Sequence, residues 1–395
     1  MPTKLPIAVI VIPTYNEANS IGEMIDYLFN KTFPGITDWD CQLLVVDDTS
    51  PDGTYKVVQE KQKKYKKLHL FLNKQKAGIG TAYVVGFRYA MKELKADVLI
   101  EFDGDFQHPP ETIPVMLKEI KDGADYVLGS RKIKGGSNPR GWGFKRVFFS
   151  EFGGFTARII LFFPFKNFLK ITDPTTGLKA SRVKDFVDKI DMDHLYSYSF
   201  AYKMDFLFQM IKLGAKTKEI PLQFGLRESG ASKIEPQTAK DVLKTVILLR
   251  WHDDFTRKFL KFGIVGGFGF IINIVGFRVF KVVFKGLPID ISWINFFSNA
   301  LASEMAIISN FTWNNLWTFR KEKISGFGQL LSKLATFNLS SFITGIIIPS
   351  SFIAVCTYFF SDKFSTIYLI IGVFGLTIPL NWFVYNTLIW KKKII

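Results

Sequence analysis

The feature that most constrains this chain is its change of character near residue 255, after which long hydrophobic segments follow one another through short loops. Each segment is close to or above the ~20 residues that a helix needs to cross ~30 Å of hydrocarbon. Buried helices of a soluble domain would need a larger polar shell than these loops supply. The sequence therefore predicts a transmembrane domain over residues 259–395, with spans at about 262–283, 291–311, 334–358 and 367–390.

The basic residues of the loops predict how this domain is oriented in the membrane. The connection between the second and third spans carries four basic residues against the single Glu322, and three consecutive lysines precede the last two residues of the chain. By the positive-inside rule both lie in the cytoplasm, and an even number of spans places the N-terminal part there too. We expect an integral, multi-pass protein of the cell membrane. The basic residues are Arg320, Lys321, Lys323, Lys333 and Lys391–Lys393.

The first half of the chain alternates short apolar runs with helical patterns, which is typical of an α/β layered domain with a largely parallel sheet. We assign residues 1–235 to this domain and residues 236–258 to an amphipathic interface helix or linker. The predicted strands lie at 7–12, 41–46, 68–72, 96–102 and 124–130.

Polar clusters follow four of these strands. Ligands of open parallel sheets bind at the carboxyl ends of the strands, so the clusters are expected to meet at one edge. They are residues 14–17, 47–53, 103–105 and 130–131.

Asp103 and Asp105 stand one residue apart in the stretch EFDGDFQHPPE. Residues at this spacing on an extended strand point to the same side, so the two carboxylates can converge. Two adjacent carboxylates repel each other unless a cation lies between them, and a hard divalent ion such as Mg²⁺ or Mn²⁺ prefers oxygen ligands. A solvated acidic turn is the alternative for this pair taken alone.

Two charged, amphipathic segments lie between these parts, at residues 141–165 and 236–259. In the first, four phenylalanines share one helical face, while Arg146 and Ser150 share another. Both segments suit a helix lying in the membrane interface. Docking onto the α/β domain is the alternative, and for the second segment both remain open. The phenylalanines are Phe144, Phe148, Phe152 and Phe155.

The net charge of +16 raises the question of an anionic partner. With 41 phenylalanines and a mean hydropathy of +0.15, the chain fits a membrane surface with anionic headgroups better than nucleic acid. We therefore expect membrane contact and no nucleic-acid partner.

The motifs of the first half resemble family 2 glycosyltransferases of the GT-A fold. VIPTYNE, VVDDTSPDGT, DGDFQHPPE, GSR, DPTTGLKA and GLRESGASK occur in the order that this family uses. Within it, the chain is similar to polyprenyl-phosphate (dolichol-phosphate) mannose synthases with a GtrA-like four-helix transmembrane domain, on the evidence of residues Asn310–Arg320. The departures, at Gly104, Thr49 and Leu178, remove no charged or ligating group.

The resemblance implies a role for each matching residue. Asp105 and Arg131 would be catalytic. The metal would be bound by Asp103, Asp105 and Gln107, and the acceptor phosphate by Arg131, Arg146 and Ser150. The nucleotide sugar would be bound by Pro13, Tyr15, Glu17, Val46, Asp48, Asp103, Gly104, Asp105, Gln107, Arg227 and Lys233.

The implied activity is transfer of mannose from GDP-mannose to a polyprenyl or dolichyl phosphate, with inversion, for protein or glycan glycosylation. Mg²⁺ or Mn²⁺ is the implied cofactor. A glucosyl or aminosugar transferase with the same acceptor is an open alternative. A processive polysaccharide synthase is disfavoured, because Ile247 stands where the Gln-x-x-Arg-Trp motif of those enzymes has glutamine.

A lipid-linked sugar translocator is the third alternative, since GtrA-like helices occur in proposed flippases. Glu304, inside the second predicted span, is costly in a membrane and indicates function by default. A helix-pairing hydrogen bond with Asn295, Asn299 or Asn310 is the structural explanation for the same residue.

Overall fold

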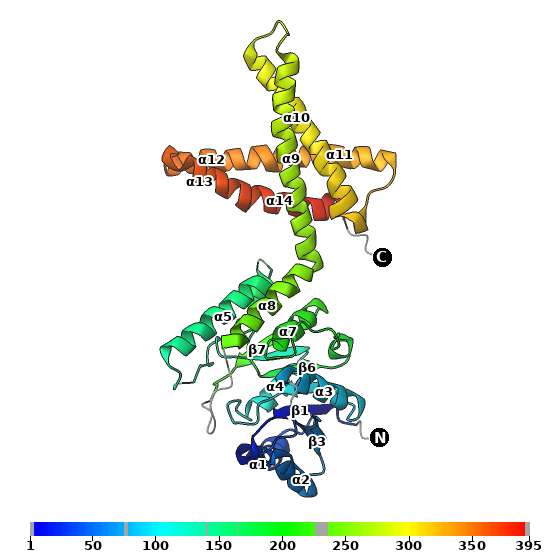
Figure 1. Cartoon of the computed structure of the whole chain (residues 1–395), viewed down its shortest axis with the longest axis vertical. Coiled ribbons are helices and arrows are strands. Elements are labelled where there is room, and N and C mark those ends of the chain that lie inside the picture. Colours follow the sequence, from blue (N-terminus) through cyan, green and yellow to red (C-terminus); the bar gives the residue numbers. More distant parts are fainter. Residues whose placement is uncertain (1–3, 75–77, 140, 164, 226–235, 392–395) are drawn as a thin grey trace. The chain divides into compact units, whose positions relative to one another are not determined.

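The computed structural model describes residues 4–74, 78–139, 141–163, 165–225 and 236–391. It divides the chain into two compact units, Met1–Trp251 and His252–Ile395. Figure 1 labels most of their helices and strands.

The first unit is built on a seven-stranded sheet in the order β3-β2-β1-β4-β6-β5-β7. Every pairing is parallel except those of β6, which runs antiparallel between β4 and β5. The predicted α/β class and largely parallel sheet are confirmed. The strands are β1 (Ile7–Thr14), β2 (Asp40–Asp47), β3 (Leu68–Leu72), β4 (Val98–Glu101), β5 (Tyr126–Ser130), β6 (Lys179–Arg182) and β7 (Thr217–Pro221).

Helices cover both faces of this sheet. In β1, Val9 and Val11 belong to one hydrophobic core and Ile10 and Ile12 to the other, as the alternation of a doubly buried strand requires. The first core includes residues of α3, α5, α7 and α8, and the second residues of α1 and α4. The helices are α1 (Ala18–Tyr27), α2 (Thr54–Lys64), α3 (Ile79–Lys92), α4 (Thr112–Lys121), α5 (Phe144–Phe162), α6 (Asn167–Lys170), α7 (Tyr202–Lys212) and α8 (Pro236–His252).

The two amphipathic segments form α5 and α8, and both dock on the α/β unit. Leu161 of α5 and Val246 and Leu249 of α8 are buried in its first core. Their outer faces stay apolar, and Phe144 of α5 is 84% exposed. Docking and contact with a membrane interface are therefore compatible for these helices. The other exposed apolar side chains include Phe148, Phe149, Phe152 and Phe155 on α5, and Leu243, Ile247 and Trp251 on α8.

The second unit is entirely helical over its described residues. Three helices there are long and apolar enough to cross a membrane: Asp254–Phe284, Phe327–Phe359 and Ser365–Ile389. The last two contain short π-helical turns. The labelled helices are α9 (Asp254–Phe284), α10 (Ile291–Trp313), α11 (Phe327–Phe342), α12 (Ile348–Phe359), α13 (Ser365–Ile371) and α14 (Ile378–Val384).

The predicted span at 291–311 forms α10, which has sufficient length but is not among the three apolar helices. Its hydropathy is lowered by a row of asparagine and serine residues and by Glu304. The count of four spans is therefore not confirmed and stays a prediction.

Helix α10 packs closely along α9, as Figure 1 shows. Contact is close because small residues face each other: a Cβ on Gly276 would lie 3.2 Å from the Cβ of Ala302. The amide of Asn273 also donates to Ser303 Oγ at 2.9 Å. The polar side chains of α10 thus belong in part to a helix–helix interface.

Glu304 corrects one expectation. Its carboxylate oxygens accept hydrogen bonds from Asn338 Nδ2 of α11 at 2.6 and 2.7 Å, and not from an asparagine of its own helix. Side chains on the same face of one helix extend in parallel, side by side. A side chain on a facing helix can instead point its amide directly at the carboxylate. Glu304 therefore ties α10 to α11.

Three segments of the second unit meet at one end. Trp390 Nε1 donates to Asn315 Oδ1 at 3.0 Å and its ring stacks on Phe319 at 4.5 Å. Lys258, in the first turns of α9, pairs with Glu322 at 3.0 Å. The start of α9, the connection from α10 to α11 and the end of the last helix are therefore neighbours.

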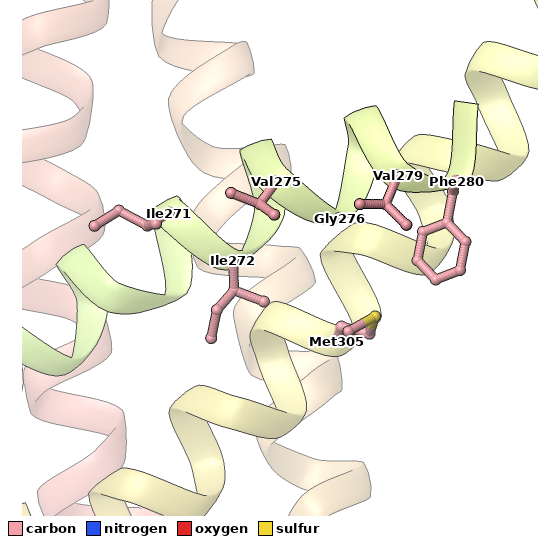
Figure 2. Close-up of a pocket in the computed structure, with 7 residues that line it drawn as sticks. All are labelled: Ile271, Ile272, Val275, Gly276, Val279, Phe280 and Met305. Atoms are coloured by element: carbon pink, nitrogen blue, oxygen red, sulfur yellow. The ribbon is translucent and has the colours of Figure 1, made fainter. Parts of the chain in front are cut away.

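A pocket of about 400 Å³ lies between α9 and α10 (Figure 2). Its lining is almost wholly apolar and includes no ionisable side chain, so it offers no chemistry of its own. The lining residues are Ile271, Ile272, Val275, Gly276, Val279, Phe280 and Met305.

Candidate active site

The ends of β1 and β2 are fixed side by side by the register of the sheet. Pro13 pairs with Val46 and Thr14 with Asp47. The buried Asp47 carboxylate accepts from Thr14 Oγ1 at 2.9 Å and from the amide and hydroxyl of Ser50 at 2.8 and 2.7 Å. This carboxylate therefore joins two of the predicted polar clusters.

The residues predicted to bind the base and ribose lie at this junction. Pro13, Tyr15 and Glu17 are partly exposed there. Asp48 is buried and accepts a hydrogen bond from Asn73 Nδ2 at 2.7 Å. The side chain of Val46 is fully buried in the first core, so only its backbone is at the edge.

The loop after β4 carries the paired aspartates. The strand ends at Glu101, two residues before Asp103, so a turn and not strand alternation sets the direction of the two carboxylates. Asp105 is 8% exposed and its Oδ1 accepts the backbone N–H of Gln107 at 3.1 Å. A Cβ on Gly104 would lie 3.1 Å from the side chain of Ile12, so this loop lies against the end of β1.

The donor set of this loop fits a hard divalent cation only in part. Within the described residues no three His, Cys, Asp or Glu side chains converge on one point. Two carboxylates and the amide oxygen of Gln107 would supply an incomplete oxygen shell. Mg²⁺ is commonly held by one or two carboxylates with phosphate oxygens of a substrate completing the shell, so the set suits a metal bound together with a diphosphate.

His108 follows these residues and was not predicted to have a role. It is fully buried, and its Nδ1 accepts the backbone N–H of Asp103 at 3.1 Å. Burial lowers the pKa of His108 to about 4, against the opposing effect of the Asp103 carboxylate. The imidazole is therefore neutral at pH 7. The only signal in the sequence is its place beside the paired aspartates.

Arg131, at the end of β5, is held in a buried ion pair. Its Nε and Nη2 donate to the two carboxylate oxygens of Asp173 at 2.7 and 2.8 Å, and Nη1 lies 3.5 Å from Ser150 Oγ. Burial raises the pKa of Asp173, but the charge and hydrogen bonds of Arg131 outweigh it, and the pKa ends below its ordinary value. The edge of the guanidinium formed by Nε and Nη2 is thus engaged, and Nη1 is on the side of α5.

A glutamate on β7 supports this ion pair from behind. Glu219 accepts the backbone N–H groups of Thr172 and Asp173 at 2.7 and 3.0 Å, and the hydroxyl of Thr172 at 2.7 Å. Asp173 and Glu219 were missed because neither stands in a polar cluster after a predicted strand.

An aromatic cluster joins the two sides of the site. The ring of Phe224 lies 5.5 Å from that of His108, 6.0 Å from that of Trp142 and 5.9 Å from the guanidinium carbon of Arg131. The guanidinium of Arg146 in turn lies 4.1 Å over the Trp142 ring. Phe224 therefore connects the aspartate loop with both arginines, although it was not predicted.

Comparison with known proteins decides the family. Residues 9–183 match the model of glycosyl transferase family 2, and residues 261–390 match the GtrA/DPMS transmembrane domain. A dolichol-phosphate mannosyltransferase of Pyrococcus furiosus is 33% identical over 333 residues, which cover 84% of this chain and 86% of that protein. The chain belongs to glycosyltransferase family 2.

Further relatives extend this result. An undecaprenyl-phosphate mannosyltransferase of Micrococcus luteus is 34% identical over 61% of this chain and 95% of its own length. Among solved structures, glucosyl-3-phosphoglycerate synthase of Mycobacterium tuberculosis aligns with a TM-score of 0.45 at 16% identity, over 62% of this chain and 79% of that chain. By its two family matches, the glycosyltransferase has both parts that its motifs predicted, an α/β catalytic domain and a GtrA-type membrane domain.

In this glycosyltransferase, the structure brings most of the predicted residues to one edge of the sheet, while Arg227 and Lys233 lie outside the described residues. The described chain before them ends at Gly225, whose backbone N–H donates to Gln107 O at 2.9 Å. Gln107 Nε2 also donates to Gly225 O at 3.3 Å. The segment that leads to Arg227 therefore starts beside the aspartate loop.

Proposed function

We propose that this glycosyltransferase transfers mannose from GDP-mannose to a polyprenyl phosphate, of the dolichyl type, with inversion at the anomeric carbon. The proposal is carried by one observation: Arg131 lies 3.5 Å from Ser150 on α5, a helix that exposes a row of phenylalanines on another face. A phosphate bound there would be held by a helix whose other face suits a membrane interface. The relatives named as mannosyltransferases of dolichol phosphate and undecaprenyl phosphate support the same acceptor class.

The donor would bind at the ends of β1, β2 and β4. We assign the base and ribose to Pro13, Tyr15, Glu17, the backbone of Val46 and Asp48, and the diphosphate to the aspartate loop. Asp103, Asp105 and Gln107 would hold Mg²⁺ or Mn²⁺. Such a cation neutralises the charge that develops on the leaving diphosphate. Arg227 and Lys233 are proposed to add positive charge to the same group.

On the acceptor side, two arginines would hold the phosphate. Arg131 already has a fixed direction because both oxygens of Asp173 engage the Nε–Nη2 edge of its guanidinium, so Nη1 and the Ser150 hydroxyl are positioned in advance. Arg146 lies one helical turn before Ser150 on α5. Charge-assisted hydrogen bonds from guanidinium groups suit phosphate oxygens, and pre-orientation lowers the entropic cost of binding.

The reaction needs no strong general base. A phosphate monoester with a second pKa near ~6 is already anionic at pH 7. One of its oxygens would attack the anomeric carbon from the face opposite the diphosphate, forming the new C–O bond as the bond to the diphosphate breaks. GDP leaves with the electron pair, and the configuration inverts. The arginines would orient the acceptor and balance its charge throughout.

We also propose that the catalytic domain and the C-terminus face the cytoplasm and that four helices cross the membrane. The basic loop at Arg320–Lys323 and the end of the last helix lie at the same end of the second unit, as this topology requires. α10 would be tolerated in the bilayer because its Glu304 is paired with Asn338 of α11 and its Ser303 with Asn273 of α9.

The donor and acceptor are tested together by incubating membranes containing the protein with radiolabelled GDP-mannose or UDP-glucose and a polyprenyl phosphate. We expect labelled lipid from GDP-mannose only, and none from membranes that lack the protein. Labelled lipid from UDP-glucose alone would replace mannose by glucose in the proposal, and label in neither lipid fraction would refute the proposed combination of donor and acceptor.

Arg146→Ala is expected to weaken the apparent affinity for polyprenyl phosphate about 10- to 100-fold, because a charge-assisted contact contributes ~1.5–3 kcal/mol. Donor affinity, measured by calorimetry without lipid, should barely change. Lys145→Ala is the matched control, since it removes a charge from the neighbouring exposed position of α5. A loss of GDP-mannose binding with an unchanged lipid saturation curve would place Arg146 in the donor site instead.

A further inference from the structure

The ring of His108 has one nitrogen whose hydrogen bond is missing. Because Nδ1 accepts the backbone N–H of Asp103, the proton of the neutral ring is on Nε2. Nε2 is buried and has no hydrogen-bond partner among the described residues. The carboxylate oxygen Oδ2 of Asp103 lies 3.5 Å away, just beyond a good hydrogen bond.

The position of the ring makes Asp103 the group that can close this gap. The ring packs against Phe102 and Phe224, each at 5.5 Å between centroids. On another side, a Cβ on Gly177 would approach its Cε1 to 3.0 Å, so the ring has no space to turn there. The Asp103 side chain is 28% exposed and lies in a loop, so a small rotation can bring Oδ2 within reach of Nε2.

We propose that His108 is a positioning residue that holds the Asp103 carboxylate in the orientation that binds the divalent cation. Its Nε2–H would donate to Oδ2 of Asp103, which leaves the other carboxylate oxygen for the metal. Residues that hydrogen-bond a ligating carboxylate fix its direction, and their loss typically costs 10- to 100-fold in metal affinity. This inference rests on the proposed function and deepens it.

The arrangement also explains why a histidine is needed at this position. One ring nitrogen accepts from the Asp103 backbone and the other faces the Asp103 carboxylate, so a single rigid side chain ties both ends of the same residue. The fixed ring geometry restricts Asp103 before any cation arrives, which reduces the entropy that binding must remove.

Two substitutions test the roles of the two ring nitrogens of His108 separately. In His108→Asn, the amide oxygen stands near the position of Nδ1 and keeps an acceptor for the Asp103 backbone, but the donor at Nε2 is lost. In His108→Gln, an amide N–H reaches the position of Nε2 and keeps the donor, but the backbone acceptor is lost. Each variant leaves one buried polar group unmatched, so each controls for the loss of stability in the other.

The experiment titrates Mn²⁺ into the full-length protein in detergent with saturating GDP, and measures free Mn²⁺ by electron paramagnetic resonance. We expect His108→Asn to weaken Mn²⁺ binding about 10- to 100-fold and His108→Gln to stay within about 3-fold of wild type. The thermal midpoint of each variant is recorded alongside. Wild-type Mn²⁺ affinity in His108→Asn, or a greater loss in His108→Gln than in His108→Asn, overturns the positioning role.

The same titration tests the proposed metal-assisted function separately from the role of His108. If the wild-type protein itself binds no Mn²⁺ in the presence of GDP, the proposed metal-assisted function fails, and the role of His108 fails with it. If wild-type binding is tight and both variants match it, the role of His108 alone is refuted.

Discussion

Asp105→Asn is expected to lower the rate of sugar transfer at least about 10³-fold while the protein keeps its fold. The neutral amide cannot balance a divalent cation, and loss of about 4 kcal/mol of transition-state stabilisation corresponds to that factor. The backbone N–H of Gln107 still finds an acceptor in the asparagine side-chain oxygen, so the turn after β4 is retained. Transfer of radiolabelled mannose to lipid measures the effect, and the thermal midpoint checks the fold.

Chelation gives the same prediction without a mutation. Wild-type transfer should disappear in excess EDTA and return when Mg²⁺ or Mn²⁺ is added in excess of the chelator. Asp122→Asn is the matched control for the variant, since it removes the same charge from an exposed position at the end of α4. Full activity in excess chelator, or in Asp105→Asn, would rule out the metal site.

Arg131→Met is expected to destabilise the first unit by about 3–5 kcal/mol, because it leaves the Asp173 carboxylate buried and unpaired. For a domain of this size the thermal midpoint should fall by roughly 6–20 °C. Transfer should be lost as well, since Nη1 of Arg131 is proposed to bind the acceptor phosphate. Circular dichroism of the protein in detergent measures the midpoint.

A double variant and a surface control show whether the loss of stability in Arg131→Met comes from the unpaired buried charge. Arg131→Met with Asp173→Leu should recover more than half of the lost stability, because no buried charge remains, but should not recover transfer. Arg88→Met removes an exposed pair with Asp193, and a change of at most about 1 kcal/mol is expected there. Equal midpoints for Arg131→Met and wild type would show that the buried pair does not stabilise the fold.

The pH dependence of stability follows from the same carboxylate. The pKa of Asp173 is lower in the folded protein than in the unfolded chain, where it is about 3.9. Its contribution to the free energy of unfolding is therefore fully present above about pH 4 and is lost as the pH falls through the folded pKa. Arg131→Met should flatten this part of the acid-unfolding curve.

Local patterns in the sequence determined much of this protein. The apolar runs locate β1 to β5, and the alternation of strands and helices gives the α/β class, because a doubly buried parallel strand needs a continuous apolar run. The same reasoning found the polar edge of the sheet, the exposed phenylalanines of α5 and the apolar helices after residue 255. Each of these follows from a few neighbouring residues.

Only the tertiary structure decided what lies between the predicted elements. β6, with the sequence KASR, has no apolar run, and it is a strand because β4 and β5 pair with it on both sides. Asp173 is 42 residues from Arg131, and Glu219 is a further 46 from Asp173. Glu304 pairs with Asn338 for the same kind of reason. These contacts join residues that are distant in the chain, so they depend on how the sheet and helices assemble, and no local periodicity encodes which two side chains will meet.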